Sequence, residues 1–133
     1  MNGFHPTVER GDKSIEVIAG RGTKILFREL ICVLDHDEFS ELGGIEILDF
    51  ESQLGGTSIG PSPTVGYPRW SYDPEVDAAY IRVSGARAQA QISSTAVATI
   101  SASGQLVSLR VAWDCNFFGV NPEMELRKTG LVP

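Results

Sequence analysis

The sequence has no apolar run that approaches the roughly 20 residues a membrane-spanning helix needs. Its N-terminus, MNGFHPTVERGDK, has no apolar signal region. The 133 residues include only two cysteines and two histidines, and no pair of cysteines has the spacing of a zinc site. These absences predict a cytoplasmic, single-domain protein that does not contact the membrane and has no metal or other cofactor.

The two cysteines carry little information about the compartment. Cys32 lies in the apolar run ELICVL, and Cys115 follows Trp113-Asp114. In a cytosolic chain we expect both thiols to be reduced, because cytosolic disulfides are rare. A disulfide between the two remains the alternative.

Basic residues are also scarce, 11 against 17 acidic ones, for a net charge of −6. The imbalance lies entirely in residues 1–51, which hold eleven acids and five bases, whereas residues 52–133 hold six of each. A uniform basic face is therefore disfavoured, and we expect no nucleic-acid partner. A basic protein partner suits the acidic half electrostatically, and a merely solvated acidic surface is the alternative.

The sequence lacks the arrangements that nucleophilic catalysis and phosphate binding require. Ser71, Ser84 and Ser101 have no strand-turn-helix context for a nucleophile. The stretch GRGTK is too short for a phosphate-binding loop. We predict no catalytic residue and no enzymatic activity.

A glycine- and proline-rich stretch, GGTSIGPSPTVGYPR at residues 55–69, divides the chain into two segments of similar size. Each segment runs from a short apolar stretch through a turn to a longer stretch, a polar turn and a last apolar stretch. In the comparison of the two, Gly20 matches Gly85 and Cys32 matches Val97, and with one extra residue in the first copy Ile45 matches Leu109. The pattern indicates an internal repeat.

Most of the segments between turns predict strands. Leu109 and Val111 alternate with Ser108 and Arg110, which is strand periodicity. The run KILFRELICVL is apolar on both faces and would suit a helix of three turns, but its repeat partner QAQISSTAVATI favours a strand. Near the C-terminus, NPEMELRKTG has a capping Asn121, a first-turn Pro122 and a closing Gly130, which predicts a short helix.

We therefore predict a mainly β protein of two tandem antiparallel β-meander repeats, packed into one pseudo-twofold domain with a short C-terminal helix. We expect residues 1–51 to form the first repeat, 52–69 the linker loop, 70–115 the second repeat and 116–133 the tail with the helix. The final LVP is native or the start of an engineered protease site.

The stretch YDPEVDAAYIRV resembles the opening of the small bacterial domain-of-unknown-function 2283 family, and DHDEFSELGGIEIL resembles its ending. The opening lies in the second half of this chain and the ending in the first, which supports duplication followed by divergence. The resemblance covers residues 12–50 and 70–113. It implies a small antiparallel β fold, no assigned activity and a link of some relatives to toxin genes, but it carries over no catalytic residue.

Two acidic stretches are candidate sites. Asp73, Glu75 and Asp77 suit a hard cation, but a tight turn capped by Asp73 and fixed by Pro74 is favoured, since a calcium loop is longer and has a central glycine. The densest acidic cluster surrounds His36. Its carboxylates are the residues that we expect to contact a basic partner: Asp35, Asp37, Glu38 and Glu41. A plain solvated hairpin turn is the alternative.

Two functions fit these observations. The first is a protein-binding module of the antitoxin or immunity type, which neutralises a basic, toxin-like protein through the acidic cluster. The alternative is a small-ligand binder for a nucleotide or metabolite, whose cleft between the repeats would be lined by Trp70 and Tyr80. A homodimer is an open alternative for the assembly.

Overall fold

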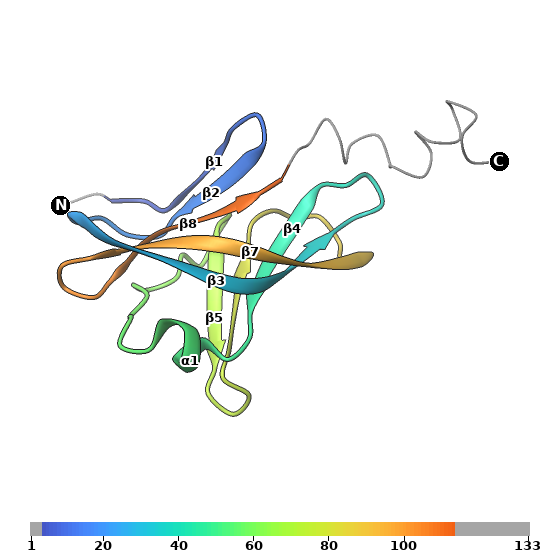
Figure 1. Cartoon of the computed structure of the whole chain (residues 1–133). Coiled ribbons are helices and arrows are strands. Elements are labelled where there is room, and N and C mark those ends of the chain that lie inside the picture. The colour runs from blue at the N-terminus through green and yellow to red at the C-terminus, as the bar shows by residue number, and fades with distance from the viewer. Residues whose placement is uncertain (1–3, 114–133) are drawn as a thin grey trace.

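The computed structural model describes residues 4–113 and places eight antiparallel strands in one curled, half-barrel sheet with one short helix (Figure 1). The elements are β1 (Thr7–Arg10), β2 (Ser14–Ile18), β3 (Lys24–His36), β4 (Leu42–Ile47), α1 (Phe50–Leu54), β5 (Arg69–Asp73), β6 (Ala78–Arg82), β7 (Ala90–Ser101) and β8 (Leu106–Ala112). The expected mainly β fold is confirmed. The predicted C-terminal helix, Cys115 and the final LVP lie outside the described residues.

The strand order in the sheet is β1-β2-β8-β7-β3-β4-β6-β5. The two longest strands, β3 and β7, lie side by side at its centre and pair along almost their whole length (Figure 1). This order differs from two separate meanders, because β2 and β3 do not pair. Instead β2 pairs with β8, and β6 pairs with β4. The first and second halves of the chain are thus interleaved.

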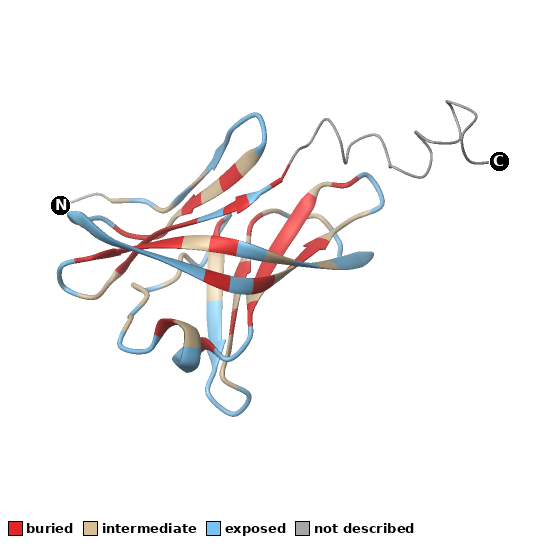
Figure 2. Ribbon diagram, in the orientation of Figure 1, coloured by how far each residue is buried: buried red, intermediate tan, exposed pale blue. Residues whose placement is uncertain are grey.

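Strand periodicity places the core on one face of this sheet. Ile15 and Val17 of β2 are buried, as are Ala79 and Ile81 of β6, and their sequence neighbours are less buried. Successive side chains of a strand point to opposite faces, so this alternation builds one apolar layer. Figure 2 shows the buried residues alternating with more exposed ones along the strands. Phe50 and Leu54 of α1 join the same core.

The stretch WSYDPEVDAAYIRV forms a β-hairpin of β5 and β6, as the turn interpretation predicted. The Asp73 carboxylate accepts a hydrogen bond from the Glu75 N–H at 3.0 Å, which is the bond expected of an aspartate that opens a turn. Asp77 closes the turn with a positive φ of 53°. Its carboxylate also accepts the Glu51 N–H at the start of α1, at 3.1 Å.

The helix α1 was not predicted. Its five residues are too few to show a helical period, and its N-cap residue, Asp49, makes no side-chain capping bond. The capping carboxylate comes from Asp77, on a turn 26 residues later in the chain. This tertiary contact supplies the partner for an N–H that the first turn of a helix leaves free.

Candidate functional site

Asp35 lies inside the protein rather than on an acidic surface. It occupies the register shift of β3 next to His36, and its side chain is only 5% exposed. The Tyr80 hydroxyl donates a short hydrogen bond to one carboxylate oxygen, and the Gln91 amide donates to the other at 3.0 Å. Asp35 therefore organises a polar cluster between β3, β6 and β7, and its carboxylate is not available to a partner protein.

Tyr80 is held as a proton donor in this cluster. Burial and the hydrogen bond to Asp35 raise the pKa of Tyr80 to about 12. The phenol stays protonated at neutral pH, and the arrangement satisfies both groups. A carboxylate with its donors in place and a protonated phenol suit a structural role better than acid–base catalysis.

The other three acidic residues near His36 have separate roles. The Asp37 carboxylate accepts the N–H groups of Phe39 and Glu41, both at 2.9 Å, and so shapes the β3–β4 turn. Glu41 forms a half-exposed ion pair with Arg10 of β1 at 2.9 Å. Glu38 is exposed. The structure thus brings Asp37 and Glu38 together at the turn, but gives Asp35 and Glu41 other partners.

Trp70 and Tyr80 point to opposite faces of the sheet. Directly paired residues of antiparallel strands share a face, and Trp70 pairs with the buried Ile81, whereas Tyr80 pairs with Ser71. The Trp70 indole N–H donates to the Gly60 carbonyl at 2.7 Å, which fastens the 55–68 loop to β5. These two residues therefore cannot line a single cleft.

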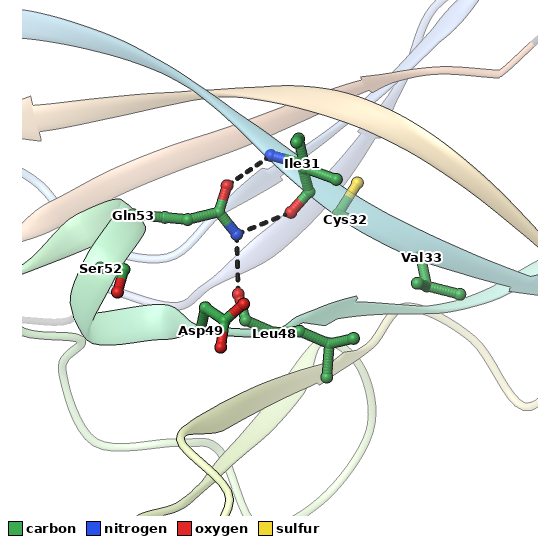
Figure 3. A pocket seen from close by; sticks show the side chains of 7 residues that line it. All are labelled: Ile31, Cys32, Val33, Leu48, Asp49, Ser52 and Gln53. Atoms are coloured by element: carbon green, nitrogen blue, oxygen red, sulfur yellow. Dashed lines mark hydrogen bonds between the residues drawn. The ribbon is translucent and has the colours of Figure 1, made fainter.

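The cavity beside β3 and α1 was not predicted from the sequence. Its volume is about 320 Å³, and it is lined by Ile31, Cys32, Val33, Leu48, Asp49, Ser52 and Gln53 (Figure 3). Cys32 is a free, buried cysteine, and burial raises the pKa of its thiol to about 11. That thiol is protonated at neutral pH and is a poor nucleophile.

At this cavity the Gln53 carboxamide takes the place of a neighbouring strand. Its oxygen accepts the Ile31 N–H at 2.6 Å, and its nitrogen donates to the carbonyls of Ile31 at 2.9 Å and Leu48 at 2.7 Å (Figure 3). The carboxamide thereby supplies one donor and one acceptor to Ile31, as a paired strand would.

On the N-terminal side of Ile31, one edge of β3 has no paired strand in the described part of the chain. β3 pairs with β7 from Lys24 to His36, but with β4 only from Val33 onward. Because the Ile31 backbone groups point away from β7, alternation directs those of Phe27 and Glu29 to the same side. Within residues 4–113 no backbone or side-chain group pairs with them. Phe27 is 67% exposed, and Ile25 and Ile31 are similarly exposed.

Amide hydrogen exchange of the full chain tests this open edge. We expect the N–H groups of Phe27 and Glu29 to exchange much faster than those of Arg28 and Leu30, which face the β7 ladder. Residue-resolved exchange rates from NMR give the comparison. Equal protection of all four amides would show that another part of the chain covers the edge.

Comparisons with known proteins do not identify the chain. No model of a known protein family matches it, no curated protein matches it and no solved structure matches it. The resemblance to the domain-of-unknown-function 2283 family remains a prediction. In the described part of the chain, no helix is long and apolar enough to cross a membrane. The same residues contain no group of three or more histidine, cysteine, aspartate or glutamate side chains placed to hold a metal ion.

Proposed function

We propose that this protein is a non-enzymatic protein-binding module of the antitoxin or immunity type, and that an extended segment of its partner pairs with the open edge of β3. The observation that carries the proposal is the unpaired backbone of Phe27 and Glu29 beside exposed apolar side chains. Proteins usually shorten, charge or cover such an edge. An added strand supplies the missing hydrogen bonds, and this is a common way to bind a peptide segment.

Charge favours a basic partner. The net charge of −6 attracts a basic protein over distances set by the ionic strength and speeds the encounter. We place the contact with the partner at the β3 edge rather than at the predicted acidic cluster, because Asp35 is buried and Glu41 is paired with Arg10. In this proposal the acidic surface steers the partner, and the β3 edge holds it.

We also propose that the chain contains a duplication, in which β2–β4 and β6–β8 are the two copies. A duplication relates the chain to families that are built from one such three-stranded unit. Leu34 pairs with Ile45, and the residues 64 positions later, Ala98 and Leu109, also pair. The register shift after Asp35 recurs after Thr99. This constant spacing supports two diverged copies that have exchanged strands, and it needs no extra residue in the first copy.

One further pair of backbone hydrogen bonds supports that spacing of 64 residues. The Ala19 N–H donates to the Val107 carbonyl at 2.8 Å, and the Val83 N–H donates to the Gly43 carbonyl at the same distance. Superposition of β2–β4 on β6–β8 in a crystal structure tests the duplication. A best fit that pairs residues at a spacing other than 64 would contradict it.

Partner capture with two matched variants tests the binding surface. Phe27→Lys places a charge on the open edge, whereas Phe39→Lys makes the same change at an equally exposed turn residue. We expect the wild type and Phe39→Lys to retain a basic protein from a lysate of the native host, and Phe27→Lys to lose at least about 90% of it, as loss of a central apolar contact implies. Quantitative mass spectrometry measures the retained amounts.

Phe27→Pro is the sharper version of the same experiment. It removes the outward N–H of Phe27 without removing a donor of the β3–β7 ladder, since proline is tolerated on an open edge. The variant should fold and should fail to retain the partner. Retention by both Phe27 variants would exclude the β3 edge as the binding surface.

A further inference from the structure

Two arginines lie directly opposite each other at the far end of the sheet. Arg69 of β5 and Arg82 of β6 are register partners, so their side chains share a face. Like charges in this position destabilise a strand pair. Both side chains are only partly exposed, so water screens their repulsion less than it does on an open surface. The pair is therefore a concentration of positive charge in an acidic protein.

The ring of Tyr67 holds both guanidinium groups. The Arg69 guanidinium carbon lies 4.8 Å from the ring centroid and that of Arg82 lies 5.9 Å from it. Both distances are within the range of a cation–π contact. Because the ring already restricts both guanidinium groups, the arginine side chains lose less conformational entropy when they bind a ligand.

The donors of this pair are not satisfied by the described residues. The Arg82 Nε atom is buried and has no hydrogen-bond partner, and its Nη2 atom makes only a long bond of 3.4 Å to the Ser84 carbonyl. Neither arginine forms an ion pair within residues 4–113. A buried donor without a partner is costly, and the site therefore favours a ligand that accepts from it.

The carboxylates on the same face do not fill this role. In the register, Gly44 separates Asp35 from Arg82, and both oxygens of Asp35 already accept bonds from Tyr80 and Gln91. Glu46 lies diagonally across from Arg82 and makes no ion pair with it. Among residues 4–113, no acceptor on this face completes the pair.

We propose that Arg69 and Arg82 form a binding site for an oxyanion, a phosphate or carboxylate group, backed by Tyr67. A planar guanidinium matches such groups with two parallel hydrogen bonds, and an anion between two arginines removes their repulsion. The site is on the β5–β6 hairpin and does not depend on binding at the β3 edge.

Titration of the full chain with inorganic phosphate, at constant ionic strength, tests the site. The arginine side-chain Nε–H signals in NMR spectra report it, and we expect the signals of Arg69 and Arg82 to shift saturably. A parallel titration with acetate distinguishes the sources of the oxyanion, because saturation by phosphate alone indicates a phosphoryl group and saturation by acetate alone indicates a carboxylate. Saturation by neither overturns the proposal.

Matched variants locate the binding. Arg69→Gln and Arg82→Gln should each weaken binding of the saturating anion by about tenfold or more, as loss of a charged hydrogen-bond donor implies. Arg69→Lys keeps the charge but loses the planar fork and should bind with intermediate affinity. The control Arg28→Gln changes an exposed arginine of β3 and should bind as the wild type does. Equal weakening in the control and in both site variants would show non-specific attraction and overturn the proposal.

Discussion

Replacement of Ile45 by alanine is expected to lower the free energy of unfolding by about 3 kcal/mol, because it opens a cavity among fully buried side chains. Ile45 has no exposed surface, and it pairs with Leu34 on one side and Ile81 on the other. It therefore joins β3, β4 and β6 within the core. A loss of this size is a large share of the stability of a typical domain.

Ile31→Ala is the matched control for this prediction. Ile31 is the same residue type in the same sheet, but its side chain is 66% exposed, so the change should cost less than about 0.5 kcal/mol. Urea denaturation of both full-length variants gives the two free energies. Similar costs for the two substitutions would contradict the position of the core.

The second large effect is expected at Gly44, where the backbone passes under Tyr80. A Cβ atom added at Gly44 would lie 2.2 Å from the Tyr80 hydroxyl oxygen and 2.6 Å from the ring carbon that bears it. Tyr80 would have to move and would lose its hydrogen bond to Asp35, leaving a buried carboxylate short of a donor. We expect Gly44→Ala to cost about 2–4 kcal/mol.

A double-mutant cycle separates this clash from an effect on the backbone. In the Tyr80→Ala background the clashing ring is gone, so Gly44→Ala should cost less than about 1 kcal/mol there. The four free energies of unfolding come from denaturant titrations of the full chain. Costs that simply add would show that Gly44 and Tyr80 are not coupled, and would contradict the arrangement.

The strands could be predicted from the sequence because their signals are local. KILFRELICVL is apolar on both faces, and the structure explains why: one face of β3 joins the core, while Phe27 and Ile31 remain exposed on the other. Asp73 and Pro74 marked the turn before β6, since an aspartate and a proline act within a few residues of their own position. The β assignment of both segments is confirmed.

The pairing of the strands could not be predicted in the same way. Nothing local in β2 distinguishes β3 from β8 as its neighbour, because both are apolar and of suitable length. The candidate sites depend on that pairing. Trp70 and Tyr80 were expected in one cleft, but their faces follow from the register of β5 on β6. Asp35 was expected at the surface, but residues from β6 and β7 enclose it.

The carboxamide of Gln53 also bears on how the protein behaves on its own. An unpaired strand edge with exposed apolar residues is a template on which further copies can assemble into aggregates or fibrils. Gln53 occupies this edge at Ile31, so one side chain determines how many residues of β3 remain free to pair with another copy. A shorter side chain at position 53 would lengthen the unpaired part of this edge. The purified chain would then remain monodisperse only up to a lower concentration.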